Sequence, residues 1–212
     1  YDEVSKNRFE SLEYKGDGFG LVLRGSRWVL RATTGENRYK YLTPGYPYGT
    51  DLNDEKKEYR RYSFRYDADS WYLLTGYDTQ RYEILQNEGN FYEDSAFTAE
   101  LGGRSTMGEA LVAWGLFFRY EDTDFSDGWG APVTSKNRNN LAPFMEASYA
   151  VGDCVANLGL RYEIWRQDSN DHDELIPKIS IQRQFANGNI FYLAASRVFA
   201  MPSFYEMYVE SA

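Results

Sequence analysis

The residues best suited to covalent chemistry in this 212-residue chain are His172, its only histidine, and Ser203. Nothing in the sequence orients His172 toward a serine nucleophile, so a Ser–His–Asp triad is not indicated. Ser203 and Glu206, which follow Pro202, have the spacing of a helix capping box rather than that of a nucleophile and its base. We therefore expect no enzyme activity and no catalytic residues.

Two oxygen-rich stretches are the candidates for a cation site. Residues 168–174 could offer carboxylates to calcium, and so could residues 51–55. The first stretch lacks the glycine and the closing glutamate of an EF-hand loop, so we favour a solvated external loop with a solvated His172. Cys154 is the only cysteine, which excludes an internal disulfide and a multi-cysteine zinc site. We expect no metal and no cofactor.

Aromatic residues on constrained backbone are the better candidates for ligand contact. Tyr46 and Tyr48 flank a proline within residues 44–50, and Trp129 lies between two glycines. Such rings can stack on metal chelates, haem or sugars. The alternative, which we favour slightly, is that they anchor loops to one another or touch lipid headgroups.

The charge balance narrows the choice of partners. Lys and Arg total 23 against 32 Asp and Glu, a formal net charge of −9, which argues against nucleic-acid binding. The chain also holds 19 Tyr, 13 Phe and 5 Trp, residues that suit surfaces where water and apolar material meet. No stretch approaches the roughly 20 apolar residues of a membrane-spanning helix.

A period of two organises the sequence and predicts strands. Between residues 154 and 164, apolar residues such as Leu158 and Ile164 alternate with polar ones such as Arg161 and Glu163. Residues 59–66 and 177–185 repeat the pattern, although Arg183 interrupts the apolar side. The predicted strands cover residues 18–24, 27–34, 58–66, 71–85, 92–101, 108–122, 141–150, 154–166, 176–185 and 190–199. With no helical crossover between them, we expect an all-β antiparallel meander.

The connections alternate between short turns and long polar stretches. Short turns rich in Gly, Asn and Asp are predicted at residues 25–26, 67–70, 102–107, 151–153 and 186–189. Long external loops are predicted at residues 35–57, 86–94, 124–140 and 167–175. Such an alternation is typical of an outer-membrane β-barrel, which has an apolar outside and a polar lumen.

The positions of the aromatic residues fit strands that cross two membrane interfaces. Trp28, Trp71 and Phe191 follow short turns, whereas Tyr120 and Trp165 lie where strands enter long stretches. On this interpretation, Leu158, Leu160, Ile164, Ile179, Ile181 and Cys154 face lipid, and Arg31, Arg61, Arg65, Arg161, Glu163 and Gln182 face the lumen. The alternative is a soluble β-rich sandwich or propeller, for example a carbohydrate-binding module whose aromatic residues form the platform.

The C-terminal third resembles a known family. Residues 141–149, 157–163, 177–181, 190–199 and 202–208 are similar, in order, to barrel segments of TonB-dependent outer-membrane receptors. The family motif of a strand followed by a proline-containing segment is matched by Ser196, Arg197, Phe199, Pro202, Ser203, Glu206 and Tyr208. Val198, Ala200 and Met201 depart from the usual Gly, basic residue and Ala.

The resemblance implies a transporter and its partners. Family members are barrels of 22 strands around an N-terminal plug, driven by the TonB energy-coupling complex, and they import iron–siderophores, haem, cobalamin and some glycans. Ten strands are under half of such a barrel, so residues 1–212 are expected to be a partial β-barrel domain without the plug and the remaining strands. We expect it in the outer membrane of a Gram-negative-type bacterium, with lipid, its own plug and a small-molecule nutrient as partners.

Overall fold

The computed structural model describes residues 10–45, 49–85, 90–127, 133–167, 171–202 and 204, and it consists of ten long strands. They are β1 (Glu10–Arg24), β2 (Trp28–Gly45), β3 (Gly49–Asp67), β4 (Trp71–Ile84), β5 (Asn90–Met107), β6 (Ala110–Asp127), β7 (Thr134–Val151), β8 (Cys154–Arg166), β9 (His172–Gln184) and β10 (Ile190–Ser196). All pair antiparallel with their neighbours in sequence order, as the alternating pattern predicts.

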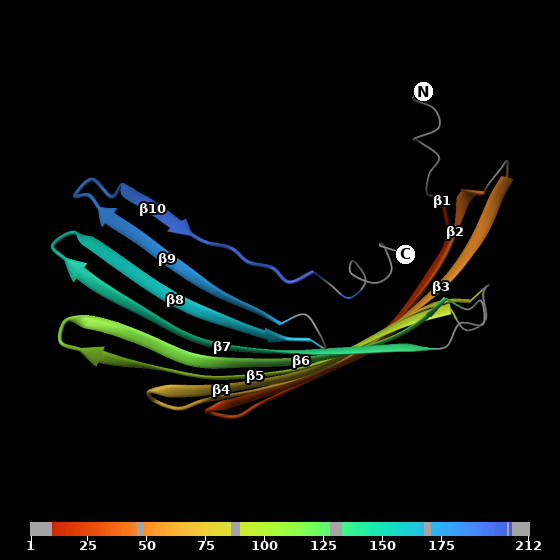
Figure 1. The fold of residues 1–212 in the computed structure, drawn as a ribbon, viewed down its shortest axis with the longest axis horizontal. Coiled ribbons are helices and arrows are strands. Elements are labelled where there is room, and N and C mark those ends of the chain that lie inside the picture. Colours follow the sequence, from red (N-terminus) through yellow and green to blue (C-terminus); the bar gives the residue numbers. More distant parts are fainter. Residues whose placement is uncertain are drawn as a thin grey trace, which may run out of the picture.

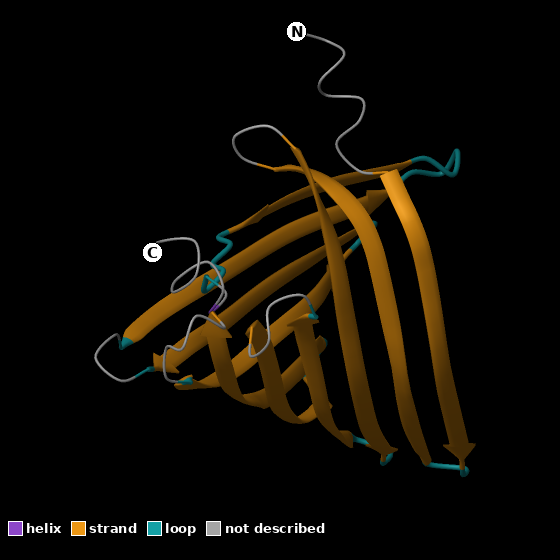
Figure 2. Cartoon of the chain, turned by 90° about the vertical axis from the view of Figure 1, so that its right-hand side faces the viewer, coloured by secondary structure: helices purple, strands orange, loops and turns teal. Residues whose placement is uncertain are grey.

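The strands form one strongly curved layer (Figure 1, Figure 2). The sheet does not close, because β1 and β10 each pair on one side only within the described residues. No second sheet is present in that part of the chain, and its only helical residue is Phe204. The sandwich alternative is therefore wrong, and the fold is that of a partial barrel.

The strand registers define two faces, which we call outer and inner. Leu158 lies opposite Ile179, and both side chains are exposed on the outer face. Arg161 and Glu163 alternate with them on the inner face, which Arg138 shares by register. Arg138 bonds Pro202 of the C-terminal segment, and that segment runs along the concave side of the sheet (Figure 1). The registers place every residue that we predicted to face lipid on the outer face and every predicted lumen residue on the inner face. Arg183 ends the outer face of β9, with its guanidinium 4.9 Å from the ring centre of Phe185.

The predicted long loops are wrong over most of their length, because these stretches continue the strands. β2 and β3 remain paired from Trp28 opposite Tyr66 out to Gly45 opposite Gly49, so most of residues 35–57 is strand. Residues 51–55 likewise belong to β3. The far halves of the strands carry mostly polar residues on both faces, so the hydrophobic alternation that was used to find strands is weak there.

The opposite set of connections, which we call the short-turn end, contains the predicted tight turns. Gly108, Gly152 and Gly188 adopt positive φ values of 62°, 56° and 84° in three of them, a conformation that favours glycine. The turn after β5 was predicted at residues 102–107 but lies at residues 108–109. Gly102 and Gly103 instead remain paired within β5, where Gly102 leaves room for the ring of Tyr72 on the adjacent strand β4.

Aromatic side chains mark both edges of an apolar band on the outer face. Trp28 and Trp71 begin β2 and β4 at the short-turn end, as predicted. At the other edge, four exposed rings lie opposite one another in register and form what we call the outer aromatic row: Tyr62, Tyr77, Phe97 and Tyr120. Trp165 was predicted at this level, but it lies on the inner face opposite Asn140.

The apolar band has different lengths on different strands. On β2 it comprises three outward side chains, from Trp28 through Leu30 to Ala32, before Glu36 and Arg38 appear on the same face. On β8 it comprises six: Cys154, Ala156, Leu158, Leu160, Tyr162 and Ile164. The band therefore widens from the first strands of the sheet toward the later ones.

Candidate functional site

The inner face of β5–β8 carries a cluster of buried and half-buried polar side chains, which we call the inner cluster. Its members are Asp94, Glu121, Thr123, Arg138, Asn140 and Glu163. Thr123 and Asn140 are each only 1% exposed, and Arg138 and Glu163 are also buried. Polar groups are rarely buried unless they are hydrogen-bonded or paired, so the partners of these side chains matter.

Arg138 links the cluster to the C-terminal segment of the chain. Its Nε donates to Glu121, and a terminal nitrogen donates to the backbone carbonyl of Pro202 at 2.6 Å. Its guanidinium also lies 4.5 Å from the ring centre of Phe204 and 5.1 Å from that of Trp165. Arg138 thus fixes the C-terminal segment to the wall of the sheet.

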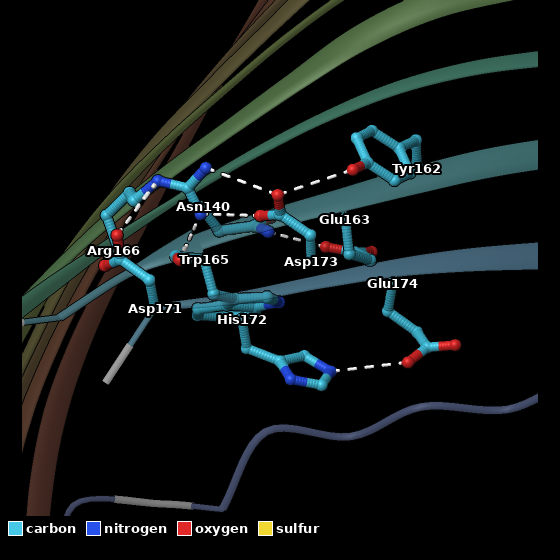
Figure 3. Close-up of polar contacts among 9 residues, drawn as sticks. All are labelled: Asn140, Tyr162, Glu163, Trp165, Arg166, Asp171, His172, Asp173 and Glu174. Atoms are coloured by element: carbon cyan, nitrogen blue, oxygen red, sulfur yellow. Dashed lines mark hydrogen bonds and ion pairs between the residues drawn. The ribbon is translucent and has the colours of Figure 1, made fainter.

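A second set of bonds runs across β7 and β8, and its bond between Asn140 and Glu163 lies beside Trp165 (Figure 3). The amide nitrogen of Asn140 donates to Oε2 of Glu163 at 2.6 Å, and Nε of Arg161 donates to Oε1 at 2.5 Å. The carboxylate of Glu163 therefore has a partner on each oxygen. This pairing allows a negative charge to remain on a buried side chain.

The third set lies on β5 and β6. The hydroxyl of Thr123 donates to Asp94 at 2.5 Å, and Tyr92 bonds the same carboxyl group. Burial raises the pKa of Asp94 above its ordinary value, and the hydrogen bonds from Thr123 and Tyr92 oppose that rise. A small cavity of about 130 Å³ adjoins this carboxyl group, Arg138 and Phe204.

The C-terminal segment, residues 197–202 with Phe204, folds back along the inner face. Arg197 pairs with Glu174 at 2.6 Å, and Phe199 stacks on His172 with ring centres 4.6 Å apart. Oε2 of the same Glu174 lies 3.4 Å from Nε2 of His172 (Figure 3), an ion pair whenever the imidazole is protonated. His172, predicted to be simply solvated, therefore begins β9 and packs under this segment.

The structure describes four of the seven residues that match the family motif. Ser196 ends β10, and Arg197, Phe199 and Pro202 all lie in the segment that contacts the inner face. Ser203, Glu206 and Tyr208 lie outside the described residues, as do the candidate ligand contacts Tyr46, Tyr48 and Trp129. The strands on either side of these three aromatic residues show that their connections lie at the end of the sheet opposite the short turns.

Sequence reasoning missed most of the inner cluster. Arg138 and Asn140 were assigned to a loop at residues 124–140, but residues 124–127 end β6 and residues 134–140 begin β7. A usable signal was present, because Glu121 on one strand lies opposite Arg138 on the next once the hairpin is extended.

The described residues form a concave wall lined by polar side chains rather than a reactive centre. They contain no group of three or more metal-binding side chains, and none of their helical structure could cross a membrane. Besides the small cavity, a hollow of about 600 Å³ lies at the short-turn end, where Gln182, Gln184 and Asp153 line it. Amide, carboxylate and guanidinium groups lining a concave wall can contact water, polar solutes or another protein segment.

The comparison with protein-family models agrees with this geometry. A family model described as "TonB dependent receptor-like, beta-barrel" matches residues 4–211. Among solved structures, the β domain of the Bordetella autotransporter BrkA is similar at 15% identity and a TM-score of 0.46, covering 86% of this chain and 82% of that one. The comparison with curated proteins gave no match.

Proposed function

The chain belongs to the TonB-dependent receptor-like β-barrel family, and on that premise we propose that its sheet is part of the wall of a gated importer of a scarce nutrient. Iron–siderophore complexes, haem and cobalamin are the nutrients we propose. The family is one of transporters of the outer membrane and not of enzymes.

One observation carries the proposal: the two faces of the sheet differ in chemistry over the apolar band. Outward residues such as Leu160 and Ile179 are exposed and apolar, whereas inward residues such as Arg161 and Glu163 are charged. A barrel wall between lipid and a wet or protein-filled lumen needs this division. It supports a place in the wall of a transport barrel.

The open edges support the partners that we propose. β1 and β10 each present unpaired backbone donors and acceptors along one side, and such edges must be paired or covered in a membrane. We assign these edges to further strands of the same barrel, and residues 1–212 to a partial barrel domain. A plug inside the barrel and the TonB energy-coupling complex complete the importer.

Ligand contact is assigned to the end of the sheet opposite the short turns. We choose Tyr46, Tyr48 and Trp129 for this role because the strands before and after them end on that side of the sheet, and because aromatic rings can stack on chelates and haem. The segment from Arg197 to Pro202 lies against the inner face and lines the path behind them.

Uptake by cells that produce the full receptor tests the function. Cells with and without an active TonB complex receive a radiolabelled iron–siderophore, haem or cobalamin in separate assays. We expect TonB-dependent uptake of one of the three, and loss of most of it when Tyr46, Tyr48 and Trp129 are all replaced by Ala. Phe191→Ala, which removes an exposed outer-face ring at the short-turn end, is the control and should leave uptake unchanged.

Two results would contradict the proposal. Uptake of none of the three nutrients would remove the substrate class. Uptake that persists without TonB would remove the gated mechanism, whichever nutrient is carried.

A further inference from the structure

The outer face carries a distinctive row of side chains next to the outer aromatic row. In strand register, Thr34 lies opposite Arg60, Arg60 opposite Thr79, and Thr79 opposite Ser95. On its own strand, each of the four lies two residues beyond an outward apolar or aromatic side chain, on the side away from the short-turn end. Side chains two residues apart on a strand point to the same face, so all four lie on the outer face. We call these four residues the hydroxyl–arginine row.

Each of these four side chains can donate a hydrogen bond, and the first carboxylate along the row is Asp122 on β6, beyond Ser95 and three strands from Arg60. Arg60 lies in the middle and is exposed, with a threonine on each neighbouring strand. A guanidinium with hydroxyls beside it suits a phosphate group, because its planar donors match two phosphate oxygens and the hydroxyls reach others.

The carboxylates nearest to Arg60 hold other cations. In the next row outward, Glu36 and Glu58 hold the ammonium of Lys56 at 3.2 and 2.6 Å. Arg81 is held by Glu93 at 3.1 Å and by Glu83 at 3.8 Å. Arg60 is close enough to act on the charge of Glu58, yet among the described residues no carboxylate forms an ion pair with it. Arg60 is therefore the cation of this surface whose charge is left for an external anion.

We propose that the hydroxyl–arginine row binds the phosphate group of a lipid in the surrounding membrane. The row meets the outer aromatic row, whose exposed rings of Tyr62 and Tyr77 lie directly below Arg60 and Thr79. A phosphorylated lipid fits both features at once, with its phosphate on Arg60 and its acyl chains along the rings. A free phosphate ion would use only the first feature, on an open surface where salt screens a single charge. The proposal rests on the outer-membrane location of the chain and not on which nutrient is carried.

Lipid binding to the purified full receptor tests the site. The protein in detergent is titrated with three probes, and bound molecules are counted by native mass spectrometry. The probes are lipid A carrying its phosphates, the same lipid after removal of its phosphates, and inorganic phosphate. We expect Arg60→Gln to weaken binding of phosphorylated lipid A about tenfold, the loss of one charge-assisted hydrogen-bonded contact. Arg60→Lys should restore part of the binding, because it keeps the charge without the planar pair of donors.

Arg166→Gln is the matched control. Arg166 lies on the same outer face but already pairs with Asp173 at 2.5 Å and Asp171 at 3.5 Å, so its loss should leave lipid binding unchanged. Equal weakening by both Gln variants would overturn the site in favour of general surface charge. Equal binding of lipid A with and without phosphate, or displacement of the lipid by millimolar inorganic phosphate, would overturn the lipid phosphate as its ligand. A gel assay of heat-dependent mobility confirms that each variant is folded.

Discussion

The halves of the strands near the short turns and the far halves follow different rules. Near the short turns, apolar and charged side chains are sorted to opposite faces, as Leu158 and Arg161 show. On the far halves both faces are mostly polar, and cross-strand ion pairs such as Arg38 with Asp54 replace apolar contacts on the outside. The difference teaches that membrane contact, and not strand formation, creates the alternating pattern in this chain.

The largest effect tests where the membrane boundary lies. Leu158→Arg places a charge on the apolar part of the outer face and should cost about 2–4 kcal/mol in lipid vesicles. Ser135→Arg makes the same change on the outer face of the far half of β7 and should be nearly neutral. A costly Ser135→Arg would mean that the apolar band extends farther along β7 than its side chains indicate.

The next effect is expected from the far half of β7, where the inner face behaves as a buried core. Arg138→Met should lower the free energy of unfolding by about 2–3 kcal/mol, because it removes the buried partner of Glu121 and leaves that carboxylate with the more exposed Arg119 alone. Urea unfolding of the full receptor in lipid vesicles measures this loss. Arg119→Met is the control, since Arg119 pairs with the same carboxylate but its side chain is 38% exposed against 7% for Arg138. Equal losses in the two variants would show that burial on the far half does not matter.

A smaller effect, with a defined pH dependence, is expected from the hydrogen bond between Thr123 and Asp94. Thr123→Val should cost about 1.5–3 kcal/mol at neutral pH, because a hydroxyl bonded to a carboxylate is lost. That bond lowers the pKa of Asp94, so its contribution is present while Asp94 is ionised and fades as falling pH protonates the carboxyl group. Unfolding curves of Thr123→Val and Thr123→Ser at several pH values measure it. Thr123→Ser keeps the hydroxyl and should follow the parent, and a loss that persists unchanged in acid would contradict the assignment.

The smallest effect is expected on the outer face of the far halves. Arg38→Gln should cost only about 0.2–1 kcal/mol, because its pair with Asp54 is exposed to water and salt. The Arg38 hydrogen bond holds the pKa of Asp54 below its ordinary value, so this contribution is present above that ordinary value and is lost as pH falls through the lowered one. Stability at low and high salt is the measurement. A cost that survives about 1 M salt, where the Debye length is roughly 3 Å, would show that the pair is structural.

The fold was accessible from sequence where one face meets lipid and the other does not. The strands containing Leu158 and Ile179 were predicted within a few residues, since their alternation has a physical cause. The far half of β2, with Glu36, Arg38 and Lys40 facing outward, was assigned to a loop because nothing apolar marks its pairing. Only the partner strand reveals that these residues are extended.

The inner cluster was less accessible for a different reason. Glu163 and Arg161 were placed correctly on the inner face by period two, but their partner Asn140 lies on a neighbouring strand and follows only from the register. Trp165 was assigned to the lipid interface because it lies where a strand enters a long polar stretch, yet the register turns it inward. The contact of Arg138 with Pro202 joins residues 64 positions apart, a separation for which local patterns carry no signal.

The unequal apolar band means that the bilayer beside this wall cannot have one thickness. From Trp28 to Ala32 the band rises about 10 Å above the short-turn end, and from Cys154 to Ile164 about 25 Å, for strands that rise ~3.3 Å per residue and tilt about 40°. The second value is the full hydrocarbon height of such a membrane, and the first is less than half of it. Lipids beside β2 must compress, or must let the side chains of Glu36 and Arg38 reach upward past their tails, at a cost of fractions of a kcal/mol per Å. Short-chain lipids avoid that strain, so the side of the wall formed by β1–β3 should gather them from the surrounding leaflet.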